Sequence, residues 1–189
     1  MAGSKITHFR RKAEGKTDYK KRLKLLMAEK PRLVVRKSLN YIWMQISEYD
    51  AKGDKIIASA HSKELKKLGW KMGCCNIPAA YLTGMLLGKK AAGKKVKECV
   101  LDIGLQASIK GSRLYAALKG FVDSGMKVPF SEEIAPSEER IKGAHIADFA
   151  KKAKEGKYKS QFSALQKSNA NPEEITKQFE ELKQKIAGK

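Results

Sequence analysis

The alternation of apolar and polar positions predicts a three-stranded antiparallel meander in the first third of the chain. In the middle strand Ile42, Met44 and Ile46 share one face, and Tyr41 and Trp43 lie on the other. The segment between the second and third strands is rich in Asp, Lys and Gly, which is typical of a turn. The expected strands are residues 32–37, 40–47 and 56–60.

Apolar residues at helical spacing predict helices after the first basic residues and after the meander. Thr17, Asn76 and Ser112 are N-cap residues that mark three helix starts. The GxxxG motif at residues 84–88 is expected to permit close packing of the second of these helices on the sheet. An apolar segment at 98–103 predicts a fourth strand, and because a helix leads to it we expect parallel pairing. Two further helices are expected at residues 138–155 and 173–187. The chain is thus predicted to be an α/β protein with a mixed sheet and flanking helices.

The positive charge is concentrated at the N-terminus. Of a formal net charge of +20, half falls on residues 1–37. Residues 1–16 are basic and lack apolar periodicity, so we expect an arm that becomes ordered on its partner. An almost uniformly basic segment of this kind indicates a polyanionic partner. The expected organisation is the arm at 1–16, an α/β core at 17–145 and a helical extension at 146–189.

Nucleic acid is favoured over an anionic membrane as that polyanion. A membrane-surface helix needs a wide apolar face, and the arm offers only Ile6 and Phe9. The longest uncharged stretch, residues 72–88, contains Asn, Pro and three Gly, which disfavours a membrane span. We therefore expect a cytosolic protein that binds nucleic acid. On charge alone, a DNA-compacting chromatin protein stays open as well.

Two segments combine cations with groups that suit RNA. The first two strands place phosphate-binding cations beside flat rings that can stack on unpaired bases. For Trp43 a place in the core, under a helix, is equally open. The loop from Lys110 to Arg113 precedes a helix, so Ser112 and free backbone N–H groups can hold a phosphate with Arg113 alongside. The strand residues concerned are Arg32, Arg36, Lys37, Asn40, Tyr41 and Trp43.

Candidate catalytic and metal-binding residues are few. The three histidines and three cysteines lack the spacing of a metal site or of a nucleophilic pair, so we expect reduced thiols and neither metal nor cofactor. The segment GMLLGKK lacks the spacing of a phosphate-binding P-loop. Asp102, at a strand end, could hold a metal ion in a nuclease, although no second acid lies on the first two expected strands. A metal-dependent nuclease with Asp102 as ligand is therefore the alternative function.

Several long segments, in order, resemble the archaeal form of a ribosomal protein family. They read TDYKKRLKLLMAEKPRLVVRKSLNYIWMQI, ELKKLGWKMGCCNIPAAYLTGMLLGKKA and VLDIGLQASIKGSRLYAALKGFVDSGMKVPFSEEIAPSEERIKGAHI. The family is large-subunit ribosomal protein eighteen, equivalent to eukaryotic large-subunit protein five. The resemblance spans about Thr17 to Ile146 and implies a ribonuclease-H-like topology without nuclease activity.

This resemblance also implies a function, partners and site residues. Family members bind 5S rRNA and, with ribosomal protein five, attach it to 23S rRNA in the central protuberance of the cytoplasmic ribosome, where further proteins are neighbours. Neither a membrane nor a small-molecule substrate is implied. The family's pattern falls on the arm, the first hairpin and the KGSR loop, and the basic face of the first helix adds to these. The expected RNA-binding residues are Arg10, Arg11, Lys12, Lys20, Lys21, Arg22, Arg32, Arg36, Lys37, Asn40, Tyr41, Lys110, Gly111, Ser112 and Arg113.

Overall fold

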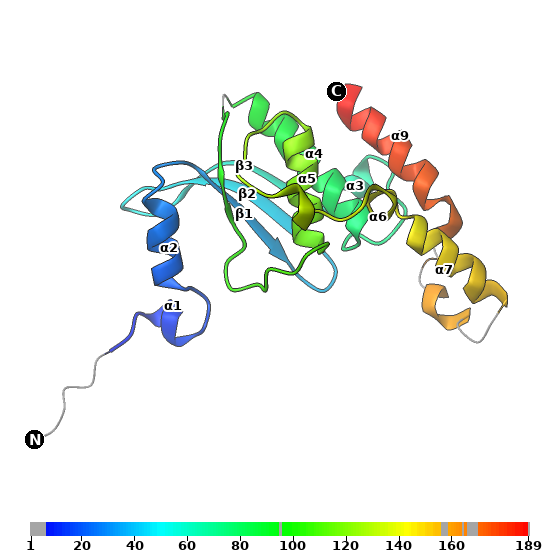
Figure 1. Cartoon of the computed structure of the whole chain (residues 1–189), viewed down its shortest axis with the longest axis horizontal. Helices are drawn as coiled ribbons and strands as arrows, with labels where there is room; N and C mark the ends of the chain where they lie inside the picture. Colours follow the sequence, from blue (N-terminus) through cyan, green and yellow to red (C-terminus); the bar gives the residue numbers. More distant parts are fainter. Residues whose placement is uncertain (1–6, 95, 156–158, 164, 166–169, 189) are drawn as a thin grey trace, which may run out of the picture.

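A four-stranded mixed sheet forms the centre of the protein (Figure 1). The computed structural model describes residues 7–94, 96–155, 159–163, 165 and 170–188. The strand order is β3-β2-β1-β4, with antiparallel β1–β2 and β2–β3 pairs and a parallel β1–β4 pair. The meander and the parallel fourth strand predicted from the sequence are both confirmed. The strands are β1 (Arg32–Lys37), β2 (Ile42–Glu48), β3 (Lys55–His61) and β4 (Val100–Asp102).

Two long helices cover one face of the sheet. Ile42, Met44 and Ile46 of β2 are fully buried on this face, as their alternation predicts. The helices are α4 (Ile77–Ala92), which contacts β2 and β3, and α5 (Arg113–Asp123), which contacts α4 and β1. Asn76 caps α4 by accepting a hydrogen bond from the Ala79 N–H at 2.8 Å. Among the residues that the structure describes, neither α4 nor α5 covers the opposite, outer face of the sheet, where Trp43 is 50% exposed.

The α4 and α5 backbones approach one another at glycines. A Cβ atom on Gly84 would lie 2.0 Å from the carbonyl oxygen of Ala117, and one on Gly120 would lie 2.0 Å from the carbonyl oxygen of Tyr81. Only a residue without a side chain fits at either position. The sequence correctly predicted close packing at the GxxxG motif, but the predicted partner was wrong, because Gly84 meets α5 and not the sheet.

The N-terminal segment forms structure of its own beside the sheet. The first two helices are α1 (Arg10–Ala13) and α2 (Tyr19–Leu26), which lie on the opposite side of the sheet region from the C-terminal helices (Figure 1). The predicted N-cap was one residue early, since the side chain of Asp18 accepts hydrogen bonds from the Lys20 and Lys21 N–H groups. The prediction of an unstructured arm also missed α1, a single turn with no buried residue.

The C-terminal segment packs on the free side of α4. A predicted helix over 138–155 is broken at Gly143, whose φ of +85° belongs to the left-handed region. The ring of Phe179 lies 5.6 Å from that of Tyr81, and Ile175 and Leu182 are also buried. The predicted boundary at residue 145 lies inside α7. The remaining helices are α3 (Glu64–Lys67), α6 (Glu138–Lys142), α7 (Ala144–Glu155) and α9 (Ile175–Gly188), with 3-10 turns at Glu132–Ile134, Lys159–Phe162 and Pro172–Glu174.

Candidate nucleic-acid interface

The arm folds back against the start of α2. The Phe9 and Tyr19 rings lie 5.1 Å apart, and Arg11 Nε donates to Thr17 Oγ1 at 3.0 Å. Lys12 and Lys20 are exposed and form no ion pair with another described residue, whereas Arg10 pairs with Glu14 at 3.6 Å. The arm and α2 therefore present cations together, on one short stretch of surface.

Two contacts fix α2 to the sheet region. Arg22 Nη2 lies 2.8 Å from Asp54 Oδ1, in the turn between β2 and β3. Lys21 Nζ donates to the carbonyl oxygen of Gly104, just beyond β4, at 3.0 Å. Burial alone would raise the pKa of Asp54, but Arg22 and Arg32 lower it below its ordinary value. Asp54 is therefore ionised at neutral pH and holds α2 electrostatically.

Arg32, which the sequence assigned to RNA, is occupied within the protein. It is 3% exposed, and its guanidinium bonds to Asp102 Oδ2 at 2.7 Å and to Asp54 Oδ2 at 2.5 Å. An RNA phosphate would have to displace two carboxylates to reach it. Arg32 thus joins β1, β4 and the β2–β3 turn through its two ion pairs.

Asp102 is likewise occupied by arginines. Arg36 Nη2 bonds to Asp102 Oδ1 at 3.0 Å, and the Gly104 N–H donates to the same oxygen at 2.8 Å. Burial alone would raise the pKa of Asp102, but Arg36, Arg32 and the Gly104 N–H lower it. Among the described residues there is no group of three His, Cys, Asp or Glu side chains that could hold a metal ion. The nuclease alternative therefore loses its proposed ligand, because the Asp102 carboxylate neutralises arginines.

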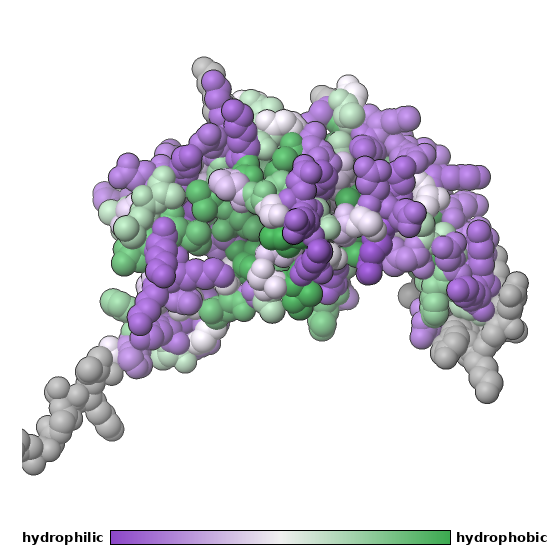
Figure 2. All heavy atoms as spheres, in the orientation of Figure 1, coloured by the Kyte–Doolittle hydropathy of each residue, from purple (hydrophilic) through white to green (hydrophobic). Residues whose placement is uncertain are grey.

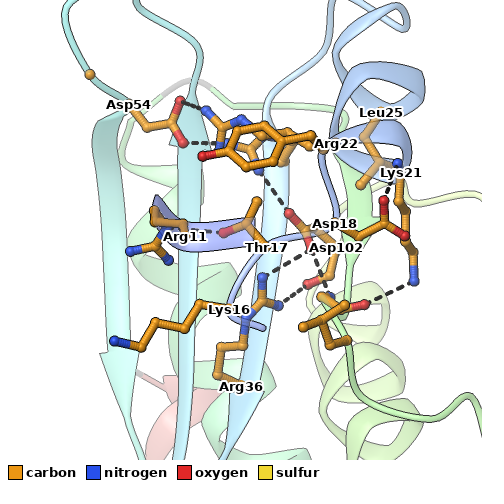
Figure 3. A pocket seen from close by; sticks show the side chains of 15 residues that line it. Arg11, Lys16, Thr17, Asp18, Lys21, Arg22, Leu25, Arg36, Asp54 and Asp102 are labelled. Carbon is orange, nitrogen blue, oxygen red and sulfur yellow. Dashed lines mark hydrogen bonds and ion pairs between the residues drawn. The ribbon is translucent and has the colours of Figure 1, made fainter. Parts of the chain in front are cut away.

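These side chains line a groove of 590 Å³ between the arm, α2 and the outer face of the sheet (Figure 3). Six cationic side chains face three carboxylates, so the groove keeps a net positive charge that attracts phosphate. Leu25 and Leu105 also line the groove. Figure 2 shows hydrophobic residues gathered between α2 and the helices α4 and α5. The cations are Arg11, Lys16, Lys21, Arg22, Arg32 and Arg36, and the acids are Asp18, Asp54 and Asp102.

The other predicted segments meet at one end of the sheet. The β1–β2 turn and the KGSR loop are joined through Cys75, whose thiol lies 3.2 Å from the Ser38 carbonyl oxygen. Arg113 Nη1 donates to the carbonyl oxygen of Cys75 at 2.8 Å. Gln106 Nε2 donates to the Lys37 carbonyl oxygen at 3.2 Å, which holds the loop after β4 along β1. Sequence reasoning selected both segments but not Cys75, because a thiol in a turn does not indicate which distant backbone groups it will contact.

The residues of the KGSR loop differ in how freely their side chains could contact a ligand. Lys110 is exposed, as is Asn40 in the β1–β2 turn. Gly111 has φ of +69° and donates its N–H to the Ile134 carbonyl oxygen at 2.9 Å. Ser112 Oγ is buried and has no hydrogen-bond partner among the described residues. Arg113 is committed to Cys75, so the cation that the loop presents to a ligand is Lys110.

The two aromatic candidates on β2 have different exposure. Trp43 is 50% exposed on the outer face, so the alternative that it packs in the core is wrong. Tyr41 is half-buried, and its ring lies 5.1 Å from that of His61.

Among the described residues, no helix has the length and apolarity needed to cross a bilayer.

Comparison with known proteins identifies the family. Residues 5–97 and 89–131 match the family described as "Ribosomal large subunit proteins 60S L5, and 50S L18". The large ribosomal subunit protein uL18 of Methanococcus maripaludis is 52% identical over 180 residues, which cover 94% of this chain and 93% of the relative. Members are structural proteins of the cytoplasmic ribosome and not enzymes, and they work among rRNA and other ribosomal proteins. The chain, with its basic groove and outer sheet face, therefore belongs to the L18/L5e family of large-subunit ribosomal proteins.

Proposed function

We propose that this protein binds 5S rRNA and, with ribosomal protein five, attaches it to 23S rRNA in the central protuberance. Binding of 5S rRNA is typical of the family to which the chain belongs. The high net charge of +20 suits a partner with a dense phosphate backbone. The remaining question is which surface of the molecule faces the RNA.

The observation that supports this function best is the gathering of cationic segments that are far apart in the sequence. The arm and α2 contact the loop after β4 through the Lys21–Gly104 hydrogen bond. That loop runs along β1 through Gln106 and Lys37, and the KGSR loop then reaches the β1–β2 turn through Cys75. Hydrogen bonds thus connect these basic segments one to the next, from α2 to the KGSR loop, which supports a role for them as a single basic surface.

In this proposal the parts of the surface have different tasks. Arg10, Arg11, Lys12 and Lys20 of the arm and α2 neutralise phosphates, which supplies affinity and no sequence preference. Lys110 and Asn40 contact the backbone and 2′-hydroxyls at the far end of the sheet, which fixes the register. Arg32 and Arg113 support the surface from within, because their guanidiniums are already bonded to Asp102 and Cys75.

Competition binding at fixed, near-physiological salt tests the proposed function. Labelled 5S rRNA bound to the protein is challenged with unlabelled 5S rRNA, tRNA and duplex DNA of equal phosphate content. Preference for 5S rRNA by orders of magnitude is expected, because shape contacts add to the shared phosphate term. Equal competition by all three would leave only the charge argument and would overturn the assignment to 5S rRNA.

A further inference from the structure

Three side chains form a row across the outer face of the sheet. The strand register pairs Arg36 of β1 with Trp43 of β2, and Trp43 with His61 of β3. Residues directly opposite one another on neighbouring strands project from the same face and stand within contact distance. A cation, an indole and an imidazole therefore lie side by side over three strands.

The aromatic end of this row is held in place. The edge of the Trp43 ring meets His61 at a centroid distance of 6.4 Å and an angle of 63°. His61 is fixed in turn, because its Nδ1 accepts a hydrogen bond from the Lys63 N–H at 3.1 Å and Tyr41 packs 5.1 Å away. Trp43 nevertheless stays 50% exposed, which for so large an apolar ring leaves considerable area open to a ligand.

The cationic end is also held in place. Arg36 donates to the carbonyl oxygen of Asp102 at 2.7 Å and to its carboxylate at 3.0 Å, yet 40% of its side chain is exposed. Gln45, two residues after Trp43 and on the same face of β2, is half-buried, and its side-chain amide forms no hydrogen bond with another described residue. The row thus offers a fixed positive charge, a flat ring and an uncommitted amide within a few strand spacings of about 4.8 Å.

We propose that this row, Arg36–Trp43–His61, binds one unpaired nucleotide of an RNA. The base stacks on Trp43, the amide of Gln45 bonds to the edge of the base, and Arg36 faces the phosphate. This inference rests on the proposed function, since the nucleotide belongs to the RNA that the basic surface binds.

Charge and polarity favour RNA over a protein as the occupant. Arg36 lines the groove, with its excess of cations, and Trp43 stands next to it in the row. A strand of RNA that lies in the groove therefore continues directly over the ring. The neighbours of Trp43 on the face include Gln45 and Ser59, whose amide and hydroxyl groups can form hydrogen bonds with a base or a ribose.

The first experiment measures affinity for 5S rRNA with Trp43 variants of the full-length chain. Trp43→Ala is expected to weaken binding by about 5- to 150-fold, the range found for loss of one base stack, while Trp43→Phe retains most of the affinity. The control is Tyr49→Ala, which removes another exposed ring (59% exposed) at the far end of β2 and leaves binding unchanged. Circular dichroism of each variant confirms that it is folded.

The second experiment detects stacking directly, by tryptophan fluorescence. The other tryptophan, Trp70, is only 2% exposed, so a ligand in solution can quench only Trp43 by contact. A single-stranded oligoadenylate heptamer should quench the fluorescence of the wild type but not that of Trp43→Phe. An abasic ribose-phosphate heptamer of equal charge should bind the groove without quenching.

The outcomes separate this inference from the proposed function. Tight, selective binding of 5S rRNA by both wild type and Trp43→Ala, with no quenching by oligoadenylate, would overturn the nucleotide site. It would leave the proposed function intact, and the outer face of the sheet would then be open to a protein partner. Absence of 5S selectivity in the wild type would instead overturn the proposed function, whatever the fluorescence.

Discussion

At the scale of single residues, burial decides which cations are available to a ligand. Arg32 and Arg36 lie four positions apart on the same face of β1, but Arg32 is 3% exposed and Arg36 keeps 40% of its side chain open. The difference arises because Asp54 and Asp102 both reach Arg32. A buried guanidinium between two carboxylates acts as a structural link, whereas a fixed but open one can also meet a phosphate.

The exchange Asp102→Asn tests this internal ion-pair network. It leaves the buried Arg32 with one carboxylate partner fewer, so the free energy of unfolding should fall by about 3–5 kcal/mol. Urea unfolding at pH 7 measures the loss. The control, Asp148→Asn, changes an exposed acid on α7 and should alter the free energy by less than about 0.5 kcal/mol. If the two exchanges lowered the free energy of unfolding equally, the ion-pair network around Arg32 would make no special contribution to stability.

The same network predicts a dependence of stability on pH. The folded protein lowers the pKa of Asp102 below its ordinary value of 3.8. The carboxylate therefore contributes stability above that pH, and the contribution is lost as the pH falls through the lower, folded pKa. The difference in unfolding free energy between wild type and Asp102→Asn should be constant near neutrality and should shrink below about pH 3.8. A difference in unfolding free energy that grew on acidification would contradict the lowered pKa of Asp102.

The three cysteines should differ in reactivity. Cys99 is 1% exposed, and burial raises its pKa to about 11, so little of the reactive thiolate exists at pH 8. Burial also raises the pKa of Cys74, whereas Cys75 is half-buried at the end of the sheet. Titration with a thiol reagent should modify Cys75 first in the native protein and all three thiols after unfolding. Rapid native reaction of Cys99, identified by mass spectrometry, would contradict this order.

At the scale of elements, the sequence predicted what depends on local pattern. The β2 alternation placed Ile42, Met44 and Ile46 correctly because one face of the strand is buried and the other is not. The helix break at Gly143, where φ is +85°, was missed because a single glycine inside a helical pattern does not by itself show whether the helix ends there. The internal ion pairs of Arg32 could not be predicted, because its partners stand 22 and 70 positions away in the chain and periodicity carries no information on such long-range pairing.

The contact between α4 and α5 gives a further prediction. Gly84→Ala would place a Cβ 2.0 Å from the Ala117 carbonyl oxygen and 2.8 Å from the Phe121 nitrogen, so the two helices must separate. Overpacking of this kind costs about 1–3 kcal/mol or more. Thermal unfolding should show a clear drop in Tm. Gly73→Ala, where nothing lies within 4 Å of the added atom, is the matched control and should leave the Tm nearly unchanged.

At the scale of the whole molecule, the most basic part of the sequence, the arm and α2, lies at one end (Figure 1). The arm and α2 occupy one end, and α7 and α9 the other. Residues 1–37 hold half of the net charge, whereas residues 138–189 mix both signs. An RNA attracted by charge alone would therefore meet the N-terminal end first.

The salt dependence of RNA binding should reflect this polarity. Exchange of Arg10, Arg11 and Lys12 for Gln should reduce the slope of log K against log salt by about 0.7–0.9 for each phosphate contact that is lost. The control changes Lys151, Lys152 and Lys177, which are exposed on α7 and α9, and removes the same formal charge. Equal changes in slope for the two triple variants would mean that net charge matters and that its position does not.

The pairing of Arg32 with Asp102 sets an order of events during synthesis of the chain. The meander can form as soon as residues 32–61 have left the polypeptide tunnel, but Arg32 then still lacks the acid that lies 70 positions downstream. The parallel strand β4 can pair with β1 only after Asp102 has emerged. The groove is also incomplete until then, because Asp102, Gly104 and Leu105 form part of its lining. A nascent chain shorter than this has the basic arm but not the shaped surface. In the proposed function, selective recognition of RNA is therefore expected only after more than half of the protein has been translated.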